Sequence, residues 1–268
     1  MVTTMVHTTG AREIIDFMES MRNEAQRELL MRFFKTGRGE YGYGDEFLGL
    51  KVPQTREVVR HAHVPLSEIS ELLMSKWHEV RLCGLLIMVE KFERLTKKRL
   101  IDDANAIRER DEILMLYLRY AEQANNWDLV DLTAPKILGH WLLLPTALGA
   151  TKDDADIGLH IDYKRKVLDN LAHNKNLWRQ RMSIVCTWKT SQLGDASWCL
   201  RYAEMLLHHP HDLMHKAVGW MLREMGKRVS MDLLRDFLSL HVHEMPRTTL
   251  RYAIEKMSDD ERKEWMKK

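Results

Sequence analysis

The chain has 268 residues, and its 41 Lys and Arg against 39 Asp and Glu leave a net charge of +2. Hydrophobic residues make up 45% and charged residues 30%, which is typical of a soluble globular protein with a core. This charge balance does not by itself indicate a nucleic-acid binder, so the local distribution of charge matters more than the sum. The longest apolar run, Leu82 to Val89, is far shorter than the roughly 20 residues of a membrane span, and Met1 to Gly10 is polar. We therefore expect a soluble intracellular protein.

Three cysteines, Cys83, Cys186 and Cys199, lie far apart in apolar surroundings and form no CxxC pair. Disulfide frameworks and zinc sites need closely spaced or paired cysteines. We interpret all three as reduced core thiols.

Almost every segment carries apolar residues at helical period, beginning with Ala11 to Phe34. A glycine-rich loop follows at 37–45, and Pro53 predicts the start of a helix that runs through His61. Further helices are predicted around 77–92, 96–107, 109–123, 127–140, 141–150, 158–173, 177–189, 195–207, 212–226, 230–241 and 246–256. Alternating Val/Ile/Thr runs bounded by turns are missing, which predicts an all-α protein without strands.

A weak internal repeat relates three of these segments. Trp77-x-x-x-Arg81, Trp127-x-x-x-Asp131 and Leu177-x-x-x-Arg181 follow one another at fifty-residue intervals. A period of about 40–50 residues with two or three helices per unit is typical of HEAT-like repeats. We predict one curved α-solenoid domain of HEAT-like repeats over residues 1–268, with residues 1–10 flexible, because no Pro/Ser-rich linker divides the chain.

The segment Asn125 to Asp131 is the first candidate for chemistry. Trp127 and Asp131 are four residues apart at a predicted helix start, so their side chains share one helical face. A carboxylate beside an aromatic ring suits a site that stabilises a developing cation. The alternative is structural, because tryptophans pack in cores and aspartates cap helices.

Arg181 is the second candidate, since it occupies the repeat position of Asp131. Equivalent positions on successive repeats face the same groove of a solenoid, which would place this acid and this base side by side. The alternative is a structural salt bridge between neighbouring repeats.

A basic stripe with a central tryptophan is the third candidate. Its members are spaced by four, three and four residues and lie on one helical face, which suits phosphate contacts combined with stacking. An ordinary solvated face is the alternative, although such faces rarely carry a central tryptophan. The stripe comprises Lys216, Trp220, Arg223 and Lys227, and Arg247 and Arg251 could continue it.

Several familiar chemistries find no support. The chain has no HExxH, P-loop, Rossmann glycine fingerprint or GxSxG motif. His211 and His215 stand four apart near His208 and His209, but no third ligand has suitable spacing, so a helix-connecting turn is favoured over a metal site.

These residues together resemble the AlkD-like family of bacterial DNA alkylation repair glycosylases, which are HEAT-like repeat proteins. The resemblance rests on Phe47 to Arg56, on Asn126 to Asp131, on Leu177 to Arg181 and on Lys216 to Glu224, and their order matches between about residues 12 and 256.

The resemblance implies roles for single residues. It places the catalytic aspartate at Asp131, its aromatic partners at Trp127 and Trp220, and a DNA-contacting arginine at Arg181. A tyrosine known in some members has no counterpart here, because its region holds two phenylalanines.

The activity that the resemblance implies is hydrolysis of the N-glycosidic bond of cationic N3- or N7-alkylated purines, such as 3-methyladenine and 7-methylguanine, without flipping the base into a pocket. We therefore expect a monofunctional base excision repair glycosylase that acts on double-stranded DNA. We expect it to be monomeric, cytoplasmic and nucleoid-associated, and to need no cofactor, metal or membrane.

Two alternatives stay open. One is a non-catalytic HEAT-repeat protein that binds branched or damaged DNA, and the other is a protein–protein scaffold. Retention of both Trp127 and Asp131 argues against the first. A scaffold predicts a groove without an aligned acid, arginine and tryptophan.

Overall fold

The computed structural model describes residues 10–151 and 156–268, and in them the chain is helical. No strand is formed in these described ranges, where the β-structure consists of isolated bridges such as Glu46 to Trp77 and Thr146 to Gly158, and this confirms the predicted all-α class. Contacts divide the chain into two compact units, and the first ends in the sequence at Thr133 where the second begins at Ala134. No helix in the described ranges combines the length and apolar character that a membrane crossing needs. The predicted flexible segment, apart from Gly10, lies outside the described residues.

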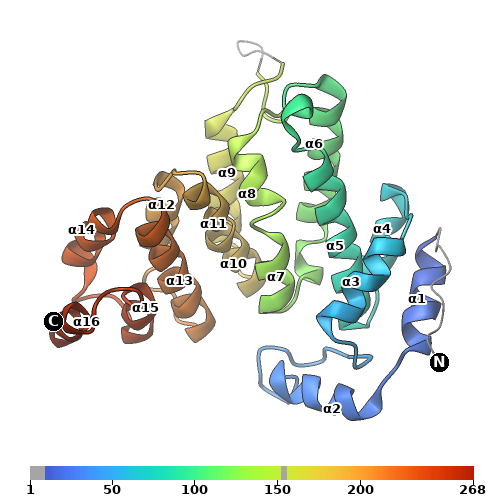
Figure 1. Cartoon of the computed structure of the whole chain (residues 1–268), viewed down its shortest axis with the longest axis horizontal. Coiled ribbons are helices and arrows are strands. Elements are labelled where there is room, and N and C mark those ends of the chain that lie inside the picture. Colours follow the sequence, from blue (N-terminus) through green and yellow to red (C-terminus); the bar gives the residue numbers. More distant parts are fainter. Residues whose placement is uncertain (1–9, 152–155) are drawn as a thin grey trace. The chain divides into compact units, whose positions relative to one another are not determined.

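The first unit is organised around one buried helix, α5 (Figure 1). This helix contacts α1, α3, α4, α6 and α7, and all its residues from His78 to Val89 are buried. The helices of the unit are α1 (Ala11–Ser20), α2 (Glu24–Phe33), α3 (Val52–His61), α4 (Ile69–Leu73), α5 (His78–Arg94), α6 (Ala104–Arg119) and α7 (Trp127–Thr133).

The first turn of α5 holds the loop that leads into α3. The backbone N–H of His78 donates to the Glu46 carbonyl over 2.8 Å. The buried Glu79 carboxylate accepts from three successive amides at 2.9, 2.9 and 3.0 Å, those of Leu48, Gly49 and Leu50. A carboxylate is the side chain that can accept several bonds at once. Glu79 therefore fixes this loop against α5.

Helix α2 lies at the edge of the first unit (Figure 1). It has no buried residue and is held at its N-terminal end. The periodic stretch Ala11 to Phe34 was predicted as one segment, but it breaks after α1. The cause is Asn23, whose side chain caps α2 by accepting from Gln26 N at 3.0 Å. Its backbone N–H also donates to Leu48 O at 2.9 Å. Gly49 must be glycine there, because its φ is +89° and a Cβ atom would meet Asn23 O at 2.1 Å.

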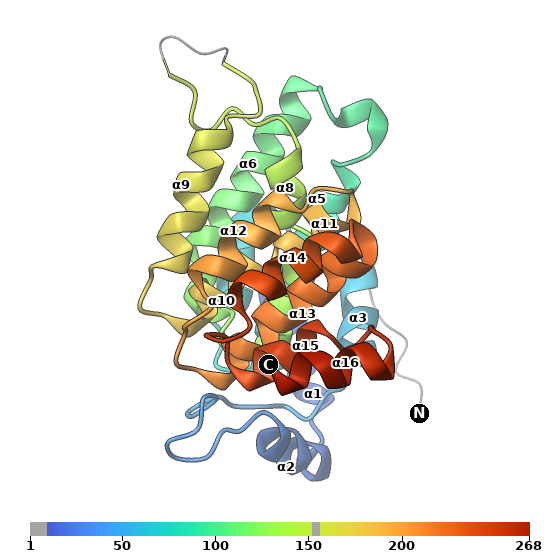
Figure 2. The ribbon, with the colours of Figure 1, turned by 90° about the vertical axis from the view of Figure 1, so that its left-hand side faces the viewer.

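The second unit is built on α13, which contacts α10 and α15 in the same unit (Figures 1 and 2). Gly219 permits close packing of α13 and α15, since a Cβ atom there would meet Thr249 O at 2.4 Å. The helices of this unit are α8 (Leu138–Leu143), α9 (Ile161–Ala172), α10 (Leu177–Val185), α11 (Thr187–Gln192), α12 (Ser197–Met205), α13 (Asp212–Arg228), α14 (Met231–His241), α15 (Arg247–Ala253) and α16 (Asp259–Lys267).

The fifty-residue spacing marks helix starts. Trp77 is the N-cap residue of α5, Trp127 is the first residue of α7, and Leu177 is the first residue of α10. Other boundaries differ from the predictions. The predicted segments 96–107 and 109–123 are largely one helix, α6, which Asp103 caps by accepting from Ala106 N at 2.8 Å. The periodic segment 127–140 ends as a helix at Thr133, and the charge-rich α16 carries too few apolar residues to have been predicted.

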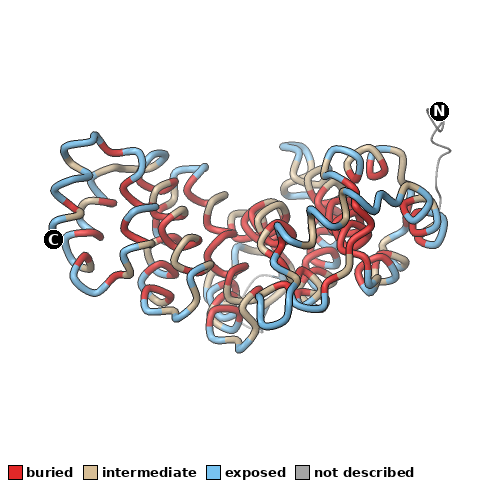
Figure 3. The backbone as a smooth tube through the Cα atoms, turned by 90° about the horizontal axis from the view of Figure 1, so that it is seen from below, coloured by how far each residue is buried: buried red, intermediate tan, exposed pale blue. Residues whose placement is uncertain are grey.

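Buried residues line the sides on which helices of one unit face each other, and exposed residues follow the outer turns (Figure 3). All three cysteines are free and buried, as predicted. Burial raises the pKa of Cys83 and of Cys199 to about 12, so these thiols are protonated packing groups.

Glu79→Gln is expected to lower the free energy of unfolding by about 3 kcal/mol, because an amide replaces two charged acceptor oxygens by one neutral one and leaves buried backbone donors without partners. Urea unfolding followed by circular dichroism measures the change. The control is Glu71→Gln on the exposed face of α4, which should stay within about 0.5 kcal/mol of the parent. Equal stability of both variants would contradict the role given to Glu79.

Candidate functional site

The start of α7 presents Trp127 and Asp131 together at the rim of the first unit. Asn126, which is buried, accepts from Trp127 N through Oδ1 at 2.8 Å and donates through Nδ2 to Phe34 O at 3.4 Å. Trp127 and Asp131 are both half-buried. Since they stand one helical turn apart, they share a face of α7. Neither is closed off in a core, so both have surface that a ligand can reach.

Aromatic rings cover one side of Trp127. Phe34 lies 5.4 Å from it between ring centroids, and Phe33 meets it edge-on at 5.8 Å. Phe34 stacks in turn on Phe47 at 5.2 Å. Phe33 remains 60% exposed, so the cluster extends from the interior to the surface. Such packing holds an indole ring in one orientation.

Beneath this cluster, a buried histidine joins two aspartates. His78 Nδ1 donates to Asp45 Oδ2 at 2.8 Å, and Nε2 donates to Asp128 Oδ2 at 2.9 Å. Its ring stacks on Phe47 at 4.3 Å and lies 5.1 Å from Phe34. Burial lowers the pKa of His78, but Asp128 and Asp45 outweigh burial and raise it to about 9. His78 is therefore an imidazolium ion at neutral pH.

Arg81 completes this buried charge cluster. Burial raises the pKa of Asp45, but His78 and Arg81 outweigh burial and lower it, and Arg81 donates to this same carboxylate. Arg81 also donates to Asn125 Oδ1 at 2.9 Å and to Gln123 O at 3.2 Å, just before α7. Two further bonds of 2.9 Å reach the carbonyls of residues 75 and 76. One guanidinium thus ties three loop segments together.

Sequence reasoning missed Asp45, His78 and Asp128. A signal was present, because a cluster of polar and charged residues, His78 to Arg81, comes directly before the longest apolar run of the chain. Charged residues at the start of a fully buried helix need partners, and the sequence could not say where in the chain those partners lie.

Arg181 of the second unit is buried, and only 5% of its surface is exposed. Its NH1 group donates to Leu213 O at 2.6 Å, at the start of α13. Arg81, its repeat counterpart, reaches Gln123 O before α7 in the same way. Both arginines therefore connect one repeat helix to the start of a later one. Contact of Arg181 with DNA stays a prediction.

The predicted basic stripe lies on α13 from Lys216 to Lys227, and its proposed continuation lies on α15. Its cations differ in their surroundings. Lys216 pairs with Asp212 at 2.7 Å. Arg223, which is mostly buried, contacts Glu224 at 3.2 Å and pairs with Glu255 of the loop after α15. Trp220 is half-buried. The other three basic residues are exposed, namely Lys227, Arg247 and Arg251.

The chain around His208 and His209 forms a turn between α12 and α13, as predicted, whereas His215 lies on α13. His211 Nδ1 accepts from Leu213 N at 3.1 Å, and His215 Nε2 lies 2.6 Å from His209 O. Within residues 10–151 and 156–268, no group of three or more His, Cys, Asp or Glu side chains is placed to hold a metal ion.

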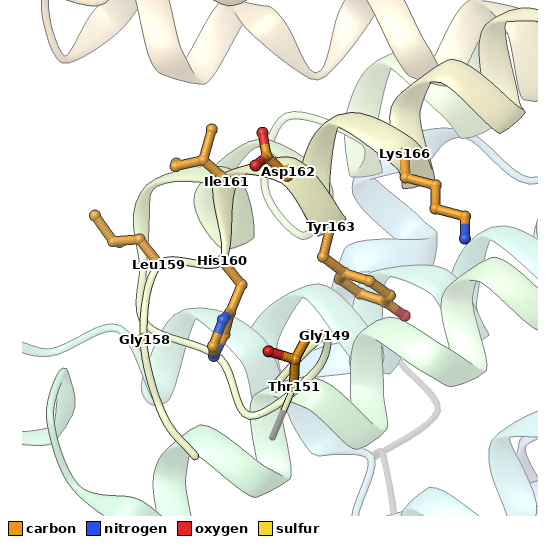
Figure 4. A pocket seen from close by; sticks show the side chains of 9 residues that line it. All are labelled: Gly149, Thr151, Gly158, Leu159, His160, Ile161, Asp162, Tyr163 and Lys166. Carbon is orange, nitrogen blue, oxygen red and sulfur yellow. The ribbon is translucent and has the colours of Figure 1, made fainter. Parts of the chain in front are cut away.

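A pocket of about 630 Å³ lies at the start of α9 in the second unit. Its lining includes His160, Tyr163 and Lys166 (Figure 4). None of the predicted site residues lines it, so this pocket is not the candidate site.

The sequence profile of a family described as DNA alkylation repair enzyme matches residues 14–257. A solved structure described as a predicted DNA alkylation repair enzyme from Enterococcus faecalis aligns with a TM-score of 0.63 and 12% sequence identity, over 89% of this chain and 97% of that one. At this identity the structural likeness concerns the fold. No curated protein sequence matches the chain.

The buried imidazolium is expected to make stability depend on pH. Because the pKa of His78 is raised from 6.5 to about 9 on folding, its contribution is complete below pH 6.5 and is lost as the pH rises through 9. The loss amounts to about 3 kcal/mol. Urea unfolding at pH 6, 8 and 9.5 of the parent and of His78→Gln isolates this contribution, because other titrating groups cancel in the difference. Parallel stability curves for the two proteins would contradict it.

Proposed function

Because the chain belongs to the family of DNA alkylation repair enzymes, we propose that it is a monofunctional DNA glycosylase. Its proposed substrates are cationic N3- and N7-alkylated purines in double-stranded DNA, and its proposed product enters base excision repair. The single observation that carries this proposal is the pair Trp127 and Asp131, which share one face of α7 and are both partly exposed beside a packed aromatic cluster.

The chemistry fits this pair. Alkylation at N7 or N3 places positive charge on the purine, so the base departs as a neutral molecule when it takes the electron pair of its bond to C1′. The sugar left behind has oxocarbenium character. The Asp131 carboxylate stabilises this cation and orients the water whose oxygen adds to C1′. The added water then releases a proton to the solvent, which leaves a neutral sugar. Trp127 presents a ring face, which attracts cationic character and excludes bulk water.

Affinity for DNA is proposed to come from the second unit. Exposed cations contact phosphates without reading sequence, and Lys227, Arg247 and Arg251 are exposed. Lys216 and Arg223 already face carboxylates, so each is proposed to contribute less than an exposed lysine. In keeping with the resemblance, we assign Trp220 a contact with DNA. The resemblance implies a DNA contact for Arg181 as well, but its burial and its bond to Leu213 O favour a structural role.

Asp131→Asn is expected to slow release of 7-methylguanine from duplex DNA by about 100-fold or more, because a neutral amide stabilises a sugar cation poorly. The measurement is the single-turnover rate of free-base release with protein in excess, corrected for spontaneous loss. DNA affinity should change less than twofold, since the carboxylate is proposed to act on the transition state.

The matched control is Asp236→Asn on the exposed face of α14, which should release base at the parent rate. No release by the parent above the spontaneous rate, with DNA still bound, would overturn the glycosylase proposal in favour of a DNA-binding protein. Full activity of Asp131→Asn would overturn the site alone.

Lys227→Ala is expected to weaken binding to all DNA sequences alike and to reduce the slope of log K against log salt by about 0.9, the value for one phosphate contact. Fluorescence anisotropy with unmodified duplexes between 50 and 200 mM salt measures it. Lys98→Ala, an exposed lysine of the first unit, is the control. An unchanged slope for Lys227→Ala would remove that residue from the proposed DNA interface.

A further inference from the structure

We propose that His78 is a positioning residue of the glycosylase site. By holding Asp128 in the interior it fixes the rotation of α7 about its axis, and so sets the direction of Trp127 and Asp131. This role rests on the proposed function, because α7 carries the proposed catalytic residue. The effect of His78 on the orientation of α7 is tested separately from activity.

The geometry of α7 makes one side chain decisive. The helix has seven residues, Trp127–Thr133, which is about two turns. Successive side chains are turned by about 100°, so Asp128 points about 100° from Trp127 and about 60° from Asp131. A tether on Asp128 therefore settles where the other two side chains point.

The tether is the bond from His78. Asp128 Oδ2 accepts from Nε2 at 2.9 Å, whereas Oδ1 is buried without a hydrogen-bond partner in the described part of the chain. The opposite nitrogen of the ring donates to Asp45 at 2.8 Å, and Arg81 holds Asp45 in turn. The ring itself is clamped by stacking on Phe47. His78 is thus rigid on its own side and can transmit a fixed position to α7.

Both bonds require the protonated ring. An ionised carboxylate only accepts hydrogen bonds, so a histidine between two carboxylates must carry a proton on each nitrogen. The charged groups that face His78 are Asp45 from the loop before α3, Asp128 from α7 and, through Asp45, Arg81 from α5 itself. Removal of one proton leaves a lone pair opposite one of the carboxylates.

Two variants separate positioning from simple stability. His78→Gln keeps a similar reach but offers one amide donor end, which can satisfy one aspartate only. The double variant His78→Gln, Asp128→Asn restores an unbroken chain, in which the glutamine amide donates to Asp45 and its carbonyl oxygen accepts from the asparagine amide. His61→Gln is the control, because His61 lies on α3, partly exposed, with Glu57 as its partner.

The first measurement is hydrogen–deuterium exchange of the peptide that contains α7, between pH 7 and 10 and corrected for the intrinsic rate. In the parent we expect protection at pH 7 that declines as the pH passes about 9. At pH 7, His78→Gln should be less protected than the parent by about tenfold or more, and the difference should shrink above pH 9. The double variant should regain protection and lose the pH dependence. This measurement needs no substrate and therefore holds even if the protein releases no base.

The second measurement is single-turnover release of 7-methylguanine under the same conditions. We expect His78→Gln to be slower by about 10- to 100-fold, as for a small misplacement of a catalytic group, with DNA affinity within twofold of the parent. The double variant should recover most of the rate. The rate of the parent should fall above pH 9, after correction for substrate changes in enzyme-free samples, whereas that of the double variant should not.

The outcomes distinguish the two proposals. Equal protection of α7 in the parent and in His78→Gln overturns the positioning role, whatever the activity. Uniform loss of protection across the first unit in His78→Gln, without rescue by the double variant, also overturns it, because His78 would then be a general stabilising residue. If the parent releases no base but the exchange of α7 responds as expected, the glycosylase proposal is overturned. The bond between His78 and Asp128 then still positions α7.

Discussion

The first unit depends on a buried charge cluster at the start of α5. His78 and Arg81 bring positive charge into a region that excludes water, and Asp45 and Asp128 bring the matching negative charge. Buried charges are costly unless each is paired and hydrogen-bonded. Because the partners come from the loop before α3 and from α7, compensation of charge forces those segments onto one end of α5. Glu79 extends the same constraint to the backbone of the neighbouring loop.

The candidate chemistry lies on this rigid base. Trp127 and Asp131 are partly exposed, whereas Asp128, which follows Trp127 in the sequence, belongs to the buried cluster. A catalytic carboxylate stabilises a transition state only when its position is fixed before the reaction begins. The rings of Phe34 and Phe47 fill the space between surface and charge cluster, so that the indole rests on packed side chains rather than on solvent.

Basic side chains have two roles along the chain. Arg81 and Arg181 occupy equivalent repeat positions, and both donate to a backbone carbonyl near the start of a later helix. Such bonds satisfy carbonyl groups and connect repeats within a unit. Lys227 and Arg251, in contrast, are exposed, which is the condition for attracting phosphates. Burial rather than residue type separates the two groups.

The sequence by itself determined the all-α class, the fifty-residue spacing of helix starts at Trp127 and Leu177, and the shared face of Trp127 and Asp131. These follow from helical periodicity, which is local. Only the tertiary structure decided that Asp128 meets His78, fifty residues away, and that Arg181 is buried. Pairing of charges across such separations depends on which helices pack together, and one helical pattern is compatible with many packings. The break of the first periodic stretch at Asn23 was likewise decided by its bond to a distant loop.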